Sequence, residues 1–491
     1  MQLLCRNHGN AGWEGKVGNH PHPLILAFSP GGGEGGRRPV EGEDSFIQSS
    51  IRGNLRSILS AIFFAGLVAS TLADPQITSW FTLDSGQFAQ IYRTDADKNA
   101  GRTETSWNNG RMGQWQPAYC GVQEILSSAN WIYVLSTGLG SQVMGPWYLD
   151  PQHRFLFPNL PTDQHIIYVI PRHPTVQTGS RFNHLGEIGL FVDGVRMFDS
   201  NDAFSYSNEN GRDADPRARI GQGDHIWNRD AYVNEGITFD AGFGHQQQFG
   251  TYHYHAEPIA LRYLLGDHVD YDTATKTYHE STAPPTKHSP IIGWMHDGYP
   301  LYGPYGYSNP TNPASGVRRM VSGFVLRDGN NGADNLAQEG RRTLPAWDAR
   351  ELQRPAELAH YETGPDVSAR YPLGHYIEDY AYLGDLGKIQ GKDFDLDELN
   401  GRWCVTPEFP QGTYAYFTAI DANGRPVYPY NMGRRYRGNP VGGLARYINE
   451  TVATNFINHA NASLAQVAQQ AGTTTLRWNP GNDGGYGMSP R

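Results

Sequence analysis

The chain has 491 residues, a formal net charge of −10 and a sequence pI of about 6.0. This length suits one large domain or two ordinary ones. The acidic balance argues against nucleic acid as a partner, because phosphate binding needs a basic face. Aromatic residues make up 12% of the chain, which holds 28 Tyr and 58 Gly. Tyr and Gly at this level favour many strands joined by tight turns over a helical bundle.

The N-terminal region is expected to lie outside the folded domain. Residues 1–50 are rich in glycine and show no periodic apolar pattern, so we expect them to be disordered. Residues 51–73 have the three parts of a secretory signal peptide, namely two arginines, an apolar run over 61–69 and small residues ahead of Asp74. The apolar run is too short for a comfortable membrane span. The protein is therefore predicted to be secreted or periplasmic, with no stable membrane span after signal cleavage.

The position of this signal within the chain is unusual. It begins well inside the chain, and no Met occurs between Met1 and Met112. We interpret residues 1–50 as a gene-model artefact, with translation beginning near Ile51 or Leu55. A buried helix or a signal anchor is the alternative interpretation of the apolar run.

From Asp74 to about residue 440, short apolar runs alternate with turn residues. Residues 131–135 and 165–170 are typical of strands. Three Asp-Gly or Asn-Gly pairs between such runs predict tight β-hairpins, at Asp193-Gly194, Asp297-Gly298 and Asn423-Gly424. We expect a mainly β fold, with residues 74–440 forming a large, elaborated antiparallel β-sandwich or barrel-like domain.

Helical periodicity is confined to the C-terminal region. From about Gly443 to Gln470, apolar residues recur mostly at steps of three and four, which predicts short amphipathic helices packed on the sheet. Residues 441–491 would then form a C-terminal helix and a loose tail. The polar segment 310–373 is broken by Gly and Pro and is interpreted as a long insertion.

Signal cleavage would leave two cysteines, Cys120 and Cys404. In an oxidising compartment they could form one disulfide. The alternative is a pair of buried free thiols. The sequence does not give the distance between them, which decides the matter.

The strongest candidate site is the run Tyr252-His253-Tyr254-His255. Side chains alternate between the faces of a strand, so the two histidines share one face and the two tyrosines the other. Two imidazoles placed in this way can chelate one metal ion, and a turn could return His245 as a third ligand. Three nitrogens with an open position are usual for catalytic zinc, and imidazole also suits copper. The pattern predicts a divalent transition metal, Cu or Zn; alternatively, the histidines only hydrogen-bond within a Tyr-rich sheet.

A second histidine-containing stretch begins at His288, which is a further candidate metal ligand. Asp297, at the tip of a predicted hairpin, is a candidate ligand, partner of an imidazole or general base. Tyr254 and Tyr302 are candidate proton handlers, which completes the set of three candidate catalytic residues. For Asp297 the alternative is ordinary turn chemistry.

The chain resembles the YHYH domain family, named for the tetrapeptide seen here at 252–255. The shared motifs extend over most of residues 118–440 and comprise Cys120-Gly121, Gly145-Pro146-Trp147, Gly186–Gly189, Asp193–Val195, Gly244-His245, His288–Gly293, Asp297–Gly303 and Leu399–Glu408. The resemblance implies an exported protein. Family members often carry cysteines that flank the YHYH run, where Ala241 and Ala260 stand in this chain, so a local disulfide is not expected.

Three functions compete on these observations. The first is a metal-dependent extracytoplasmic enzyme acting on an extracellular small molecule or polymer, by oxidation if copper stands beside tyrosine and by hydrolysis if zinc has an open position. The second is a non-catalytic protein that holds metal or binds carbohydrate on exposed aromatic side chains. The third is a structural module in which the histidines satisfy one another.

Overall fold

The computed structural model describes residues 74–110, 113–176, 185–215, 219–247 and 249–460, all within one compact unit of the chain. The predictions for residues 1–73 and for the tail from Asn479 lie outside these ranges. Among the described helices, none is long and apolar enough to cross a membrane.

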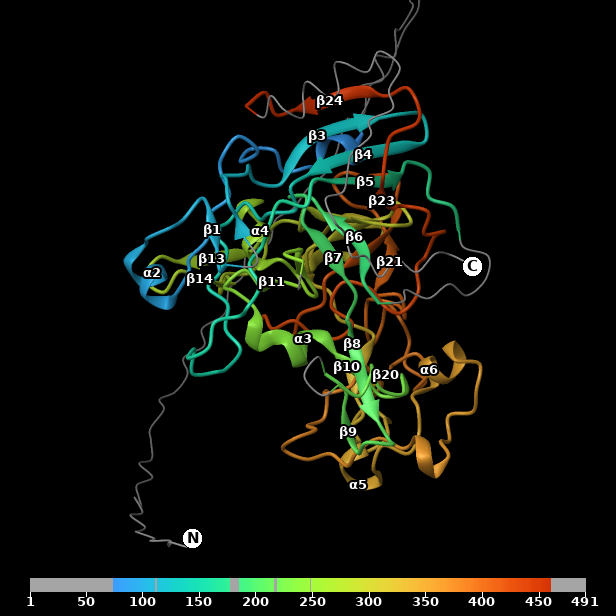
Figure 1. Cartoon of the computed structure of the whole chain (residues 1–491). Coiled ribbons are helices and arrows are strands. Elements are labelled where there is room, and N and C mark those ends of the chain that lie inside the picture. The colour runs from blue at the N-terminus through green and yellow to red at the C-terminus, as the bar shows by residue number, and fades with distance from the viewer. Residues whose placement is uncertain (1–73, 111–112, 177–184, 216–218, 248, 461–491) are drawn as a thin grey trace, which may run out of the picture. The chain divides into compact units, whose positions relative to one another are not determined.

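Two large β-sheets form the centre of the described fold (Figure 1). The five-stranded sheet is antiparallel and has the order β23 (Gly443–Ala445), β5 (Ile166–Pro171), β4 (Trp131–Ser136), β3 (Val122–Ser127) and β24 (Ala453–Ile457). The eight-stranded sheet has the order β11 (Gly244–Gln246), β12 (Tyr252–Tyr254), β7 (Arg196–Phe198), β6 (Glu187–Phe191), β15 (Ile291–Met295), β16 (Pro300–Tyr302), β22 (Thr413–Phe417) and β21 (Gly401–Cys404). The mainly β prediction is confirmed.

The eight-stranded sheet is mixed, which corrects the expectation of a purely antiparallel domain. Strand β12 runs parallel to β7, and β16 runs parallel to β22. Parallel neighbours need a long crossover connection rather than a hairpin. Such pairings join segments that are distant in sequence, so turn signals do not reveal them.

The predicted hairpins follow from local turn chemistry. Asp193-Gly194 joins β6 to β7 and Asp297-Gly298 joins β15 to β16. Both glycines have φ of +82°, a left-handed conformation that costs glycine little. The turn at Asn423-Gly424 also forms, but its strands reduce to one bridge between Ile420 and Pro426.

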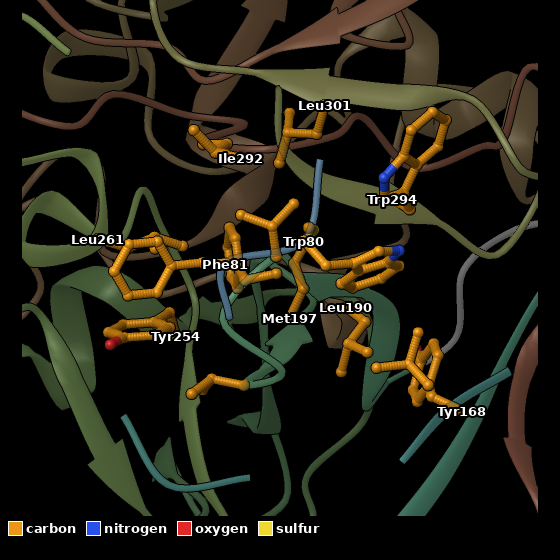
Figure 2. Packing of buried hydrophobic residues seen from close by; sticks show 14 of the residues in the cluster. Trp80, Phe81, Tyr168, Leu190, Met197, Tyr254, Leu261, Ile292, Trp294 and Leu301 are labelled. Atoms are coloured by element: carbon orange, nitrogen blue, oxygen red, sulfur yellow. The ribbon is translucent and has the colours of Figure 1, made fainter. Parts of the chain in front are cut away.

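The two large sheets share a hydrophobic core, as the layers of a sandwich do. Burial of these apolar side chains is the main stabilising term of such a fold. Figure 2 shows members of this core from both sheets and from the N-terminal and helical segments that pack on them: Trp80, Phe81, Tyr168, Leu190, Met197, Tyr254, Leu261, Ile292, Trp294 and Leu301.

Smaller elements surround the two sheets. The further strands are β1 (Trp107–Asn108), β2 (Gly113–Gln114), β8 (Asn201–Ser207), β9 (Arg212–Asp213), β10 (Asn228–Asp230), β13 (Val269–Asp272), β14 (Thr277–Glu280), β17 (Tyr305–Asn309), β18 (Asn312–Arg319), β19 (Phe324–Leu326) and β20 (Tyr380–Tyr382). The helices are α1 (Pro75–Thr78), α2 (Asp95–Ala100), α3 (Ala231–Glu235), α4 (Ile259–Leu264), α5 (Leu336–Glu339) and α6 (Ala346–Glu351), with 3-10 turns η1 (Gly236–Thr238), η2 (His360–Glu362) and η3 (Ile377–Asp379).

The segment interpreted as an insertion contains β18, β19, α5 and α6. Figure 1 labels its helices α5 and α6. Its apolar side chains contribute to two smaller hydrophobic clusters, which also contain residues from outside the segment. One includes Phe324, Trp347 and Tyr428, and the other includes Trp227 and Leu344. The segment therefore packs on other parts of the chain through its own apolar side chains.

The predicted C-terminal helices are wrong over the described residues 443–460. Strand β23 pairs with β5 and β24 pairs with β3, so the segment supplies both edges of the five-stranded sheet. The segment gains backbone hydrogen bonds by pairing with β5 and β3, and this long-range pairing outweighs the local apolar spacing. Residues 461–470 lie outside the described ranges.

Both described cysteines are free thiols. Cys120 and Cys404 are buried, so the disulfide is not formed in this structure. Burial raises the pKa of the Cys120 thiol to about 12, and burial also raises that of Cys404 although Arg402 opposes it. Neither thiol is therefore a reactive thiolate at neutral pH.

Candidate metal centre

Strands β11 and β12 bring three histidines together. The two strands pair antiparallel with His245 directly opposite His253, and His255 follows the end of β12. Residues opposite each other in an antiparallel pair project to the same face at close range. All three side chains are buried, with 3 to 5% exposure. We call His245, His253 and His255 the triad.

The ring nitrogens of the triad converge on one point. The Nε2 atoms of His245 and His253 lie 3.0 Å apart, and those of His253 and His255 lie 3.1 Å apart. One ligand atom from each of the three histidines lies within 4.8 Å of the other two. Within the described residues, this is the one group of three or more potential ligands that is close enough to hold a metal ion.

The opposite ring nitrogens are held by hydrogen bonds. The Nδ1 of His253 faces the carbonyl of Thr251 at 3.0 Å, and that of His255 faces the carbonyl of Asp199 at 2.6 Å. A carbonyl only accepts, so both Nδ1 atoms donate. These bonds leave Nε2 of the neutral rings as a bare lone pair, the form that binds metal.

Thr238 fixes the third histidine in the same form. Its hydroxyl donates to the carbonyl of Glu235 at 2.7 Å and lies 2.7 Å from Nδ1 of His245. Because the hydroxyl proton is already used, Nδ1 of His245 is the donor in the second bond. The neutral triad therefore directs three lone pairs at one another, an arrangement that a cation between them stabilises.

An acidic residue that sequence reasoning missed also reaches the triad. Glu235 is the last residue of α3, and its Oε2 lies 3.1 Å from Nε2 of His245 and 3.5 Å from Nε2 of His255. Its side chain is 26% exposed, unlike the buried histidines. In the sequence, Glu235 is only an acidic residue ten positions ahead of His245. Neither strand nor helix periodicity relates this position to the YHYH run.

Burial and Glu235 set the protonation of the centre. Burial lowers the pKa of His245 and lowers that of His253 strongly. For His255 burial acts in the same direction, but the hydrogen bond and charge of Glu235 outweigh it and raise the pKa. Burial likewise opposes the charge of Glu235, yet its hydrogen bonds to His245 and His255 hold its pKa well below the usual range.

A second carboxyl group stands beside Glu235. Burial, and then the charge of Glu235, raise the pKa of Asp202 to about 8, while Arg229 opposes the shift. The Nη2 of Arg229 lies 3.0 Å from Oδ2 of Asp202. The charges of Glu235 and Arg229 therefore act on the pKa of Asp202 in opposite directions.

Aromatic rings enclose the triad. Phe198 stacks on His253 with centroids 4.0 Å apart, Phe239 meets His245 edge-on at 4.8 Å, and Phe157 lies 6.3 Å from His245. The three phenylalanines are themselves half-buried. An apolar shell of this kind limits access of solvent to a metal site and lowers the local dielectric constant.

The tyrosines of the YHYH run lie on the opposite face, as strand alternation predicts. The hydroxyl of Tyr252 donates to Asp240 at 2.8 Å, and Gln142 donates to the hydroxyl of Tyr254 at 2.8 Å. The ring of Tyr254 belongs to the shared core (Figure 2). Gly244 makes room for these rings, since a Cβ there would lie 2.2 Å from the Tyr252 hydroxyl oxygen. A catalytic role for Tyr254 stays a prediction.

The structure does not bring His288 into the triad group. Its Nδ1 faces the carbonyl of Ser289 at 2.7 Å, and its Nε2 has no hydrogen-bond partner. Aromatic rings surround it, including those of Tyr302 and Phe417. Its assignment as a ligand stays a prediction.

The other two candidate catalytic residues bond to groups outside the triad. Asp297 accepts hydrogen bonds from the Tyr416 hydroxyl and the Gly438 amide, both at 2.8 Å. Burial raises the pKa of Asp297 to about 6, against the effect of these donors. The Tyr302 hydroxyl bonds to Thr406 at 2.8 Å and to Glu408 at 2.9 Å. Chemical roles for Asp297 and Tyr302 likewise stay predictions.

The fold and the site together define a β-sheet protein with a buried group of three converging histidines. The sequence model of the family described as "YHYH protein" matches residues 167–427, more than half of the chain. The chain therefore belongs to the YHYH protein family. Comparisons with curated proteins and with solved structures gave no match.

Proposed function

We propose that this protein binds one transition metal ion, Cu or Zn, through the Nε2 atoms of the triad. The observation that carries the proposal is the convergence of three Nε2 atoms whose Nδ1 partners are all hydrogen-bond acceptors. Two nitrogens about 2.0–2.1 Å from one zinc ion lie about 2.9–3.4 Å apart at angles of about 90–110°. The spacings of 3.0 and 3.1 Å in the triad fit this range.

Metal analysis of the native protein, purified without a histidine tag, tests the proposal. We expect about one ion per chain, the stoichiometry of a single mononuclear site, and loss of that ion in the double variant His253→Ala, His255→Ala. The exposed His360 provides a control, and His360→Ala should retain the metal. No metal above trace in the wild type, together with a melting temperature that EDTA leaves unchanged, would refute the proposal.

Export is the second part of the proposal and is supported by the three-part pattern of residues 51–73. Cleavage after Ala73 would leave Asp74 as the first residue. N-terminal sequencing of the exported product should therefore begin at Asp74. A product that keeps the apolar run 61–69 would favour the signal anchor instead.

We propose that the centre serves a metal-dependent enzyme that acts outside the cytoplasm on a small molecule or polymer, and the alternative is non-catalytic metal or carbohydrate binding. A metal held by three imidazoles keeps a position for solvent or substrate, whereas the phenylalanine shell suits a protein that merely retains its ion. Azide binding to protein loaded with Cu²⁺ separates the two, because azide needs an accessible coordination position. A spectrum that azide does not change would favour the non-catalytic alternative.

A further inference from the structure

We propose that Glu235 is a fourth ligand of the metal ion, so that the centre has three imidazole nitrogens and one carboxylate oxygen. The inference rests on the proposed metal binding by the triad and adds to it a ligand, a net charge and a preference among metals. With four protein ligands, solvent, azide or substrate reaches the ion in a fifth position or by displacing Glu235. Neither the sequence pattern nor the grouping of the three histidines includes this residue.

When the imidazoles are neutral, the contacts of Glu235 are between atoms that both lack a proton to share. Its Oε2 lies 3.1 Å from Nε2 of His245 and 3.5 Å from Nε2 of His255. Both rings donate through Nδ1, to the Thr238 hydroxyl and the Asp199 carbonyl. A neutral imidazole with its proton on Nδ1 has no donor at Nε2. With neutral rings the carboxylate therefore meets lone pairs, and either a second proton on an imidazole or a shared metal ion makes these short distances favourable; a metal ion that binds here displaces that proton.

The distances also match those around a single ion. A carboxylate oxygen binds zinc at about 2.0–2.2 Å and an imidazole nitrogen at about 2.0–2.1 Å, so neighbouring ligands lie roughly 3.0–3.5 Å apart at ordinary angles. The two Glu235 contacts fall at 3.1 and 3.5 Å. The oxygen thus lies at distances close to the 3.0 and 3.1 Å that separate the Nε2 atoms within the triad.

Helix α3 holds Glu235 in this place. Asp230 caps the helix by accepting from the Val233 amide at 3.1 Å, and the Tyr430 hydroxyl donates to both carboxylate oxygens of Asp230. The side chain of Asn234 donates to the carbonyl of His375 at 2.9 Å, which ties the other end of α3 to the neighbouring segment. Figure 1 shows α3 beside β8 and β10, with which it is in contact.

Thr238 links the proposed ligand to the triad. Its hydroxyl bridges the backbone carbonyl of Glu235 and Nδ1 of His245, at 2.7 Å each. One side chain therefore fixes the orientation of a histidine and the position of the backbone that carries the carboxylate. Such outer partners are typical of metal ligands, whose orientation they hold.

The donor set has consequences for the metal. One negative charge and no thiolate favour Zn²⁺, Cu²⁺ or Fe²⁺ over the soft ion Cu⁺. Glu235 is also the exposed member of the set, at 26% against 5% or less for the histidines. Exchange of the metal with solvent is therefore expected on the side of Glu235.

Titration of the EDTA-treated full chain with Cu²⁺, in competition with a chelator, tests the inference. We expect one equivalent bound by the wild type and none by His253→Ala. The isosteric variant Glu235→Gln should bind one equivalent at least about tenfold more weakly, because an amide oxygen lacks the charge of the carboxylate; loss of even an outer partner costs about 10–100-fold. The electron paramagnetic resonance spectrum should change as well. The exposed Glu357 offers the matched control, and Glu357→Gln should behave as the wild type.

The outcomes separate the two proposals. Absence of Cu²⁺ binding by the wild type would overturn the proposed function and this inference together. A wild type that binds, with a Glu235→Gln variant of the same affinity and the same spectrum, would overturn the inference alone. If Glu235→Gln is unfolded without metal, Glu235→Asp replaces it, and an unchanged spectrum in that variant would again refute direct ligation, because shortening the side chain must move the oxygen.

Discussion

The two histidine-containing regions of this protein differ in where their polar atoms point. In the triad, the Nδ1 atoms are satisfied and the Nε2 atoms face one another at 3.0 and 3.1 Å. At His296 both ring nitrogens face tyrosine hydroxyls, Nε2 that of Tyr168 and Nδ1 that of Tyr436. Asp297 beside it accepts from an amide and a hydroxyl. The triad is complete only with a cation, and the ring of His296 has a partner at both nitrogens as it stands.

This difference shows what separates a ligand site from a polar core. Both sites are rich in tyrosine and lie on strands or hairpins of the same sheet, although the triad is buried and His296 is half-buried. Hydrogen-bonding character distinguishes them, because lone pairs without donors call for a cation, whereas matched donors and acceptors need nothing further.

The largest expected effect is on metal affinity. The variant His253→Ala removes the nitrogen that lies next to both other members of the triad, so we expect affinity for Cu²⁺ or Zn²⁺ to fall by more than about a hundredfold, beyond the cost of losing an outer partner. The variant His296→Ala should leave the affinity unchanged. Chelator competition measures both, and equal losses in the two variants would contradict the comparison.

The next largest effect is on stability. Here the larger loss is expected at His296 and the smaller one in the triad. Truncating His296 to Ala leaves the hydroxyls of Tyr168 and Tyr436 without their ring partner, at about 1–3 kcal/mol each, and opens a cavity. We expect the free energy of unfolding to fall by about 4 kcal/mol in urea with EDTA present. Without metal, His253→Ala also opens a cavity, but it removes a repulsion between lone pairs, so we expect a smaller loss than in His296→Ala. Similar losses in both variants would count against satisfied bonding at His296.

The pH dependence of stability tests the burial of His296. Burial lowers the pKa of His296 from its ordinary 6.5 to about 4. Its contribution to stability is therefore present above pH 6.5 and is lost as the pH falls towards 4, up to roughly 3 kcal/mol. The pKa of the neighbouring Asp297 is raised to about 6, so its contribution is lost as the pH rises instead. The difference between wild type and His296→Gln isolates the histidine.

Urea midpoints between pH 4 and 7 measure this difference. Because Gln does not titrate in this range, the variant should lose less stability than the wild type on acidification. Parallel pH profiles would show that His296 is protonated as easily in the folded chain as in the unfolded one.

Much of the fold could be predicted from local signals. The glycines at 194 and 298 adopt left-handed turns that Asp-Gly pairs favour, so the two hairpins were predictable. Strands β4 and β5 follow from continuous apolar runs. Strands β23 and β24 could not be predicted, because they form by pairing with β5 and β3 far away in the sequence. Local apolar spacing there resembles that of a helix, and long-range pairing decides the outcome.

The candidate site was predictable only in part, for the same reason. Alternation along one strand places His253 and His255 on a common face, and a short hairpin can return His245. Glu235 reaches the triad from the end of a helix, and no periodicity relates a helix end to a strand face. His288 has the residue type of a ligand, but the sequence does not reveal that aromatic rings surround it.

The smallest expected effect concerns the hydroxyl that holds His245. The variant Thr238→Val keeps the shape of the side chain but removes the bonds to Nδ1 of His245 and to the carbonyl of Glu235. Loss of such an outer partner should weaken metal binding about 10–100-fold, or about 1.4–2.8 kcal/mol. Thr406→Val removes a similar bond, to Tyr302, and should change stability but not metal affinity. If Thr238→Val and Thr406→Val bind metal equally well, the hydrogen bond at Nδ1 does not orient His245 for metal binding. The difference between the triad and His296 would then depend on the Nε2 atoms alone.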